Sequence, residues 1–303
     1  MNKKKPIDDE LTLEQIKRLV VKAVYSDDQL IEHLVLKGGN ALDLVYKIGA
    51  RASVDVDFSM ADDFPGQADG LRARLDSTLR ATFQPSGLVP FDLKVEHKPH
   101  EVSQDLKAFW GGYLATFKLI AVDAYERLRG ELEGLRREAI RLGRSSNFEI
   151  EISKHEFVQP RIEREFEDVS VFVYSPEMIV AEKLRALCQQ MREYGDVVRR
   201  GNERNGGRAR DLVDIHSVVE KLQVKTSGDE FKALVADVFE AKRVPLALLR
   251  RLPNYVEIHR TDFPSVQGTL YADFKLQPFD FYWEFVLNIV RTLEPLGDEQ
   301  TPA

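Results

Sequence analysis

The chain has 303 residues, of which 43% are hydrophobic and 31% charged, and its formal net charge is −7. This composition is typical of a globular protein rather than a disordered one, and the length favours two domains over one. The acidic balance argues against a protein that coats nucleic acid through its overall field, since such proteins are generally basic. Cys188 is the only cysteine. A disulfide framework and a cysteine-based metal site are therefore excluded.

No segment has the pattern of a secretion signal or a membrane span. The N-terminal stretch MNKKKPIDDELTLEQ begins basic but continues acidic and polar, without the apolar core of a signal peptide. No run approaches the roughly 20 apolar residues that a transmembrane helix needs. We therefore expect a cytoplasmic protein with no membrane partner.

The first half of the chain mixes helices and strands. Residues 12–25 carry apolar side chains at helical spacing, and Thr12 with Gln15 fits a capping box. The apolar run HLVLKGG ends in two glycines, and NALDLVYKI continues with helical spacing. SVDVDFS alternates as a strand does, and a helix is predicted at about 66–83. Further strands are expected at 89–97, 112–121 and 147–154, with one long charged helix at 123–143.

The pattern changes near residue 175, after which strand signals are scarce. Helices are predicted at 176–195, 209–222, 228–242 and 281–293, and Pro176 suits the first turn of the first one. The segment 199–210, RRGNERNGGRAR, is interpreted as a basic loop that is either solvated or contacts phosphate groups. The sequence thus predicts an α+β fold, with a mixed β-sheet domain at 1–175 followed by a helical domain at 176–303.

Two adjacent glycines have the properties of a phosphate-binding turn. Gly38 and Gly39 lack a Cβ, so their backbone can approach a ligand closely, and the helix that follows offers unpaired N–H groups to an anion. Lys37 can add a positive charge. Most such turns are structural, so the glycines indicate function only together with the acidic residues that follow them.

Those acidic residues have the spacing of a metal site. Asp55 and Asp57 lie two apart on a predicted strand and so point to the same face, where they can share divalent cations. A third carboxylate is available from Glu149 or Glu151 on the strand at 147–154, and the spacing alone does not choose between them. The histidines show no metal-ligand spacing. Charged residues of the helical half either form structural salt bridges or reach this site: Lys183, Arg210, Asp211 and Asp214.

These motifs resemble those of a known family. KGGNAL, RASVDVDF, FEIEIS, EKLRAL and RARDLVDI follow the order found in nucleotidyltransferase toxins of the AbiEii/AbiGii type, within the DNA polymerase β superfamily. The resemblance covers roughly residues 30–220. It implies an enzyme that needs Mg²⁺ and moves a nucleoside monophosphate from an NTP to a macromolecule, with the tRNA acceptor end as the expected target. It also implies a block of translation and a cognate antitoxin.

The resemblance also implies a role for individual residues. Glu151 is favoured as the third carboxylate, because the family tends to place its acid just before the small polar end of that strand. The implied metal ligands are Asp55, Asp57 and Glu151, which with Asp211 form the catalytic set. The implied NTP-binding residues are Lys37, Gly38, Gly39, Asn40, Lys183 and Arg210, with Asp214 in support.

Three features depart from the family pattern. Asn40 stands where Ser or Thr is common, the third acid is Glu rather than Asp, and the segment at 192–208 is longer than usual. Two other functions remain open. A small-molecule nucleotidyltransferase would need an acidic pocket for a cationic substrate, and a non-catalytic nucleotide- or partner-binding module would have no need of paired metal carboxylates.

Overall fold

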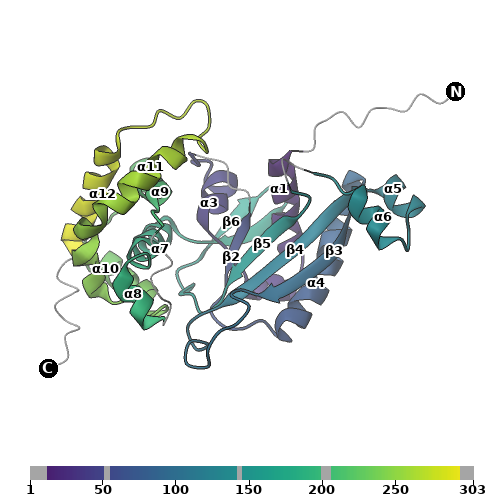
Figure 1. The fold of residues 1–303 in the computed structure, drawn as a ribbon, viewed down its shortest axis with the longest axis horizontal. Helices are drawn as coiled ribbons and strands as arrows, with labels where there is room; N and C mark the ends of the chain where they lie inside the picture. The colour runs from purple at the N-terminus through teal and green to yellow at the C-terminus, as the bar shows by residue number, and fades with distance from the viewer. Residues whose placement is uncertain (1–11, 51–54, 142–144, 199–205, 294–303) are drawn as a thin grey trace.

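A computed structural model describes residues 12–50, 55–141, 145–198 and 206–293, in which a mixed β-sheet is followed by a group of helices (Figure 1). The α+β class predicted from the sequence is confirmed. Within the described ranges, every helix is too short or too polar to cross a membrane.

The sheet contains seven strands in the order β3-β4-β5-β2-β1-β7-β6. Their bounds are Val35–Leu36 (β1), Val56–Ser59 (β2), Leu88–His97 (β3), Gly112–Ala121 (β4), Phe148–Ser153 (β5), Ile162–Phe166 (β6) and Val169–Val173 (β7). β2 pairs with β5, and β1 with β7, in parallel, and the other pairs are antiparallel. The three later strands that were predicted are confirmed. The β6–β7 hairpin was not predicted; it turns at Glu167, whose φ is +54°.

The two faces of the sheet differ in polarity. Val56 and Phe58 alternate with Asp57 on β2, and Ile150 alternates with Glu151 on β5. The apolar face packs against α1 (Leu13–Val24) and α4 (Gln67–Phe83), as Figure 1 shows. Because strand side chains alternate between faces, the carboxylates point away from these helices. They face the helical half of the molecule.

The helices of the first half follow the sequence patterns with one exception. The capping box at the start of α1 is present, and α4 lies where a helix was predicted. The long helix predicted at 123–143 is wrong. The chain forms two short helices instead, α5 (Val122–Arg127) and α6 (Leu132–Arg137), because Gly130 between them adopts a φ of +93° that no α-helix contains. The remaining short helices are α2 (Asp28–His33), α3 (Gly38–Asn40), a π-helical turn at Ala41–Val45 and a 3₁₀ turn at Gln84–Ser86.

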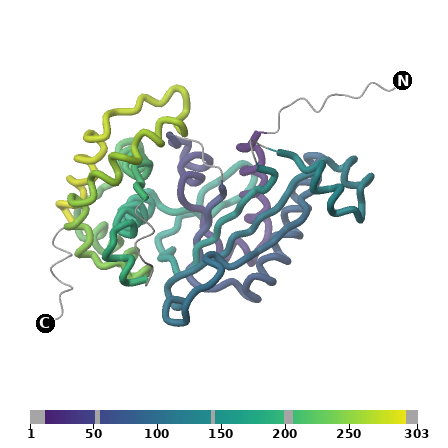
Figure 2. Tube along the Cα trace, viewed as in Figure 1, coloured from purple at the N-terminus to yellow at the C-terminus, as the bar shows by residue number. Residues whose placement is uncertain are grey.

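The described residues of the second half form helices joined by loops. Its elements are α7 (Pro176–Cys188), α8 (Arg192–Val197), α9 (Ala209–Leu222), α10 (Asp229–Glu240), a 3₁₀ segment at Leu246–Tyr255, α11 (Val256–Gln267) and α12 (Phe279–Leu293). Figure 2 shows these helices gathered beside the sheet. One hydrophobic cluster runs through both halves, from Val21 and Phe58 to Leu184 and Val286. The division at residue 175 stays a prediction.

Helix α7 begins at a sequence-encoded cap. The Ser175 hydroxyl accepts a hydrogen bond from the Met178 N–H at 3.2 Å, and Pro176 occupies the first turn. Ser175 is itself buried. The cap therefore sets where α7 leaves the sheet.

We expect Ser175→Ala to lower the free energy of unfolding by about 1 kcal/mol, because an orphan helix N–H loses its acceptor. Urea denaturation of the variant measures this loss. Ser227→Ala, at an exposed position, serves as the control and should change stability by less than about 0.5 kcal/mol. Equal stability of the two variants would contradict the capping role.

Candidate active site

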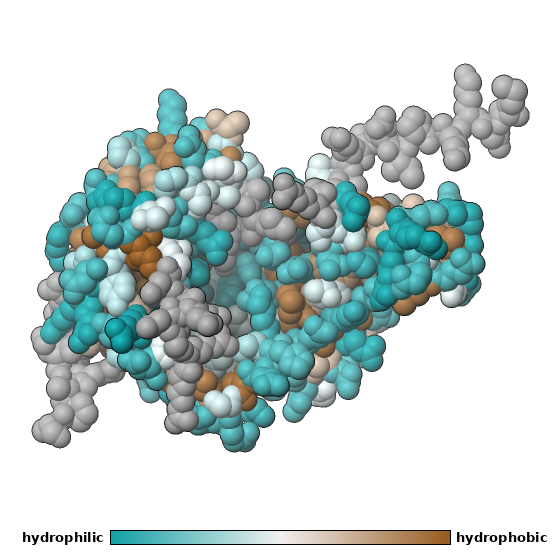
Figure 3. All heavy atoms as spheres, viewed as in Figure 1, coloured by the Kyte–Doolittle hydropathy of each residue, from teal (hydrophilic) through white to brown (hydrophobic). Residues whose placement is uncertain are grey.

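A cleft of about 540 Å³ lies between the polar face of the sheet and the helical half. Figure 3 shows a hydrophilic recess between the two parts of the molecule on one face. Positively charged side chains and carboxylates both line the cleft. The positive group comprises Lys37, Lys98, Lys183, Arg185, Arg208, Arg210 and Lys242, and the acids are Asp55, Asp57, Glu151, Glu156, Glu182 and Asp211.

The glycine turn lies directly beside the aspartates. Gly38 has a φ of +65°, and a Cβ built there would lie 3.2 Å from Asp57 Oδ2. The Lys37 N–H donates to the Asp57 carbonyl oxygen at 3.0 Å. Asn40 is fully buried, and its amide donates to the Asp55 carbonyl oxygen at 2.5 Å. The turn is therefore fastened to β2, with Asn40 behind it rather than in the cleft.

Three carboxylates crowd one another at the floor of the cleft. Asp57 and Glu151 are register partners in the parallel β2–β5 pair, and Asp55 precedes β2. Burial raises the pKa of Asp57 to about 6; Lys37 opposes this, while Glu151 and Asp55 add to it. Burial and then Glu151 also raise the pKa of Asp55. The sequence spacing did not choose between Glu149 and Glu151 on β5 as the third carboxylate. Of these two, Glu151 lines the cleft.

This group has the chemistry of a divalent cation site. Its donors are all carboxylate oxygens, which hard cations prefer, and burial first, then Glu151 and Asp55, raise the pKa of Asp57 against the opposing effect of Lys37. Lys98 Nζ lies 2.5 Å from Glu151 Oε2, and its charge also opposes the rise in the pKa of Asp55. Across the described part of the chain, no three His, Cys, Asp or Glu side chains already surround one point. The residues fit a divalent metal in the type of their donor atoms, and all three line the same cleft.

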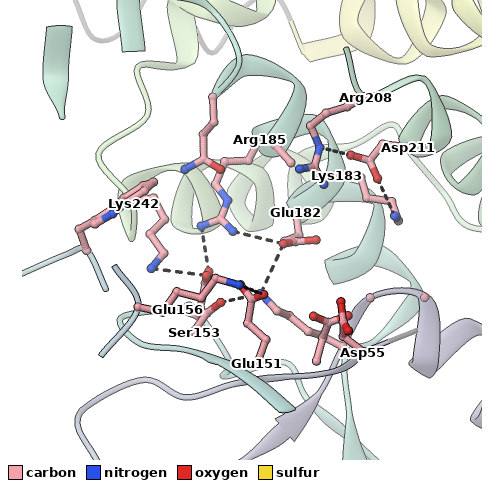
Figure 4. Close-up of a pocket in the computed structure, with 18 of the residues that line it drawn as sticks. Asp55, Glu151, Ser153, Glu156, Glu182, Lys183, Arg185, Arg208, Asp211 and Lys242 are labelled. Carbon is pink, nitrogen blue, oxygen red and sulfur yellow. Dashed lines mark hydrogen bonds and ion pairs between the residues drawn. The ribbon is translucent and has the colours of Figure 1, made fainter. Parts of the chain in front are cut away.

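A buried ion-pair network forms the wall opposite the sheet (Figure 4). Glu156, which follows β5, pairs with Arg185 at 2.8 Å and with Lys242 at 3.4 Å. Glu182 lies 3.5 Å from Arg185 and 3.7 Å from Lys37. Burial opposes ionisation of Glu156, yet Arg185, Lys242 and Lys37 hold its pKa at about 2. Three buried cations thus surround two carboxylates, which leaves positive charge next to the glycine turn.

A second buried network holds the predicted residues of the helical half. Lys183, on α7, lies 2.9 Å from Asp211 Oδ1 and 2.7 Å from Asp214 Oδ2, both on α9. Arg208 pairs with the other oxygen of Asp211. Burial disfavours the charge of Asp211, but Arg208 and Lys183 outweigh it and hold the pKa of this carboxyl well below its usual range. Arg210 is exposed at the rim of the cleft.

Helix α11 fixes the start of α9. The Arg208 N–H donates to His259 Nδ1 at 3.0 Å, and the Ala209 N–H donates to Asp262 Oδ2 at 2.9 Å. A Cβ on Gly207 would lie 2.3 Å from the Asp262 Cβ, so only glycine fits there. His259 is fully buried, and burial lowers its pKa to about 4. The neutral ring therefore stays an acceptor for the Arg208 N–H.

The structure brings most of the predicted residues to one cleft. Lys37, Gly38, Gly39, Asp55, Asp57, Glu151, Lys183, Arg210 and Asp211 line it, while Asn40 lies behind the turn. The basic loop falls partly outside the described residues, at 199–205. Sequence reasoning missed Lys98, Glu156, Glu182, Arg185 and Lys242. Glu182 and Arg185 could have been found, because two charged residues three apart interrupt an apolar helix.

We expect Glu156→Gln to lower the free energy of unfolding by about 3–5 kcal/mol, because Arg185 and Lys242 would remain buried without their shared carboxylate. Chemical denaturation followed by circular dichroism measures this. Glu165→Gln, at an exposed position on β6, is the matched control. A loss below about 1 kcal/mol would show that the network tolerates an unpaired charge and would contradict this account.

Several known proteins are similar to this chain. Among solved structures, JHP933 from Helicobacter pylori shares 18% identity, with a TM-score of 0.44 and coverage of 95% of this chain and 92% of that one. A putative nucleotidyltransferase from H. pylori shares 18%, with a TM-score of 0.45 and coverage of 96% and 97%. The nucleotidyltransferase toxin MenT4 from Mycobacterium tuberculosis H37Rv shares 15%, with a TM-score of 0.45 and coverage of 95% and 85%. No curated protein matches the chain.

The comparison with protein families identifies the family of this chain. A family model described as "Nucleotidyl transferase AbiEii toxin, Type IV TA system" matches residues 20–284, which is well over half of the chain. This match confirms the resemblance inferred from the motifs. The chain therefore belongs to the AbiEii nucleotidyltransferase toxins of type IV toxin–antitoxin systems, and is a nucleotidyltransferase with an NTP as substrate and an antitoxin as partner.

Proposed function

We propose that this toxin uses Mg²⁺ to transfer a nucleoside monophosphate from an NTP to the acceptor end of tRNA, and so blocks translation. One observation carries the proposal: three crowded carboxylates lie beside a glycine turn in a cleft that also contains buried cations. A triphosphate needs cations and backbone N–H groups, and the reacting phosphate needs the carboxylate site next to it.

The buried network suits the phosphates of the NTP. Lys37, Arg185 and Lys242 project from the turn, from α7 and from the segment after α10. Glu156 and Glu182 compensate them only in part, so an incoming phosphate group would complete the charge balance. Lys183 was predicted to contact phosphate, but the residue is only 4% exposed and its ammonium group is already bound to two aspartates. We propose that Lys183 orders α9, which brings Arg208 and Arg210 to the cleft.

The transfer is a displacement at the α-phosphorus. A hydroxyl oxygen of the acceptor bonds to that phosphorus, while its bond to the oxygen that bridges to the β-phosphate breaks and pyrophosphate leaves with the electron pair. We propose Glu151 as the group that receives the hydroxyl proton. Asp211, the other predicted candidate, is a poor base because Lys183 and Arg208 hold it ionised.

Metal ions would supply the remaining charge stabilisation. Asp55, Asp57 and Glu151 would hold divalent cations, whose charge would lower the pKa of the attacking hydroxyl and offset charge on the leaving pyrophosphate. The all-oxygen donor set favours Mg²⁺ over softer metals.

The rim of the cleft favours a polyanionic acceptor. Lys98, Arg208 and Arg210 lie at its edges, and a cationic small molecule would meet these charges unfavourably. This speaks for RNA over an antibiotic-like substrate, although the net charge of the whole chain is negative.

We expect label from at least one of the four α-labelled NTPs to enter purified tRNA when Mg²⁺ is present. Asp57→Asn should lower this transfer roughly 100-fold or more, because it removes metal charge stabilisation of several kcal/mol while keeping the side-chain shape. The measurement is the initial rate of label transfer.

Asp123→Asn, at an exposed position on α5, is the matched control and should leave the rate unchanged. If the wild type labels protein or a small molecule but no tRNA, the acceptor assignment is wrong. If Asp57→Asn retains full transfer, the metal site is wrong.

We expect NTP affinity to weaken above pH 8 through Lys242. Burial lowers the pKa of this ammonium group to about 8, although Glu156 beside it acts in the opposite direction. Lys242 is therefore charged below this pH and neutral above it, so the Kd should rise by up to about tenfold per pH unit above 8.

Calorimetric titration of a non-hydrolysable NTP from about pH 7 to pH 9.5 measures this dependence. The Lys242→Met variant should bind more weakly at low pH and lose the dependence. An unchanged pH profile in Lys242→Met would contradict the role of this residue.

A further inference from the structure

A second cavity of about 580 Å³ opens beside the cleft, at the ends of β3, β4 and β5. It falls within the range of about 300–1,000 Å³ that small-molecule sites occupy. We call it the histidine pocket. Its lining includes His97, His100, His155, Lys107, Lys154 and Trp110.

The histidine pocket and the cleft share a wall. Pro99, Trp110 and Gly111 line both cavities. Trp110 packs near Tyr194 of α8, with ring centroids 6.0 Å apart, and Lys242 lies 5.9 Å from the centre of its ring. A ligand whose charged end contacts Lys242 can therefore extend past Trp110 into the histidine pocket.

The two cavities differ in charge. In the cleft, buried cations form the wall opposite the carboxylates of the sheet. In the histidine pocket, Lys154 lies 2.9 Å from Asp63, and Lys107 and Glu101 both belong to the lining. Burial lowers the pKa of His155, and Lys242 and Lys154 lower it further, so this ring is neutral near pH 7. The cleft thus suits phosphate, and the histidine pocket suits an uncharged polar group.

The side chains of the histidine pocket match the parts of a nucleoside. Imidazole and indole rings stack on nucleobases, and neutral imidazole both donates and accepts hydrogen bonds, as a base edge requires. His97 packs against Tyr113, with ring centroids 5.0 Å apart, and its ring contributes aromatic surface to the lining of the pocket. Lys107 is exposed and can reach a ribose hydroxyl.

We propose that the histidine pocket binds the base and ribose of a nucleotide whose phosphate lies in the cleft. This inference rests on the proposed nucleotidyl transfer. The nucleoside comes either from the NTP or from the terminal nucleotide of the acceptor, and the same side chains would recognise both.

A direct binding test uses Trp110 as the reporter. Trp283, the only other tryptophan, is buried in α12, so Trp283→Phe leaves Trp110 as the sole emitter. Titration with each nucleoside 5′-monophosphate should quench its fluorescence, and ribose 5-phosphate, which lacks a base, should not. Calorimetry on the protein with both tryptophans repeats the titration and covers the case in which Trp283→Phe folds poorly.

The double variant His100→Ala/Lys107→Ala alters two exposed side chains of the pocket, and Gln104→Ala on the same loop is the control. The double variant should weaken monophosphate binding on the order of tenfold, as for the loss of one stacking or hydrogen-bonding contact to a base. Equal affinity of the double variant and the control would overturn the proposal.

Transfer kinetics then identify the source of the nucleoside. A rise confined to the KM for NTP assigns the pocket to the NTP, and a rise confined to the KM for tRNA assigns it to the acceptor. Unchanged values of both, in an enzyme that labels tRNA, overturn the inference while the proposed function stands. If the wild type transfers nothing, the proposed function fails, and the monophosphate titration still decides whether the pocket binds nucleosides.

Discussion

The buried ion pair between Glu156 and Arg185 is the interaction on which the cleft depends. Glu156 follows the inner strand β5, and Arg185 lies in the last turn of α7, so their contact at 2.8 Å fixes the helical half against the sheet. Because charges at this depth must be compensated, Lys37, Lys242 and Glu182 are drawn to the same place. The wall of the cleft is thus set by charge balance as much as by apolar packing.

The carboxylates on the sheet side of the cleft are arranged against their own charge repulsion. Asp55, Asp57 and Glu151 are held together by the β2–β5 register, although their charges repel and burial disfavours ionisation. A fold selected for stability alone would separate these acids or pair each with a cation. Such a conflict between local electrostatics and the fold is characteristic of sites that bind a ligand of opposite charge. In this cleft one wall carries more cations than carboxylates, and the other carries more carboxylates than cations.

The sequence predicted the carboxylate side of the cleft better than the ion-pair side. The reason is how far apart in the sequence the contacting residues lie. Gly38, Asp55 and Asp57 lie within 20 residues of each other, and Glu151 joins them through a strand whose alternation is plain in the sequence. Glu156 and Lys242 carry no local pattern, since each is a single charged residue that acquires a partner only when distant segments meet. The prediction of one long helix at 123–143 was wrong for a local reason. It relied on the helical spacing of the residues and gave too little weight to the break that Gly130 introduces. The β6–β7 hairpin was missed because the three central residues of β6 are charged and exposed.

The support of α9 by α11 has a consequence for synthesis of the toxin. Arg208 and Ala209 are held by His259 and Asp262, which follow them by about 50 residues. A chain still emerging from the ribosome holds the glycine turn and the carboxylates long before it holds the residues that seat Arg208. The cleft is therefore assembled only late in translation.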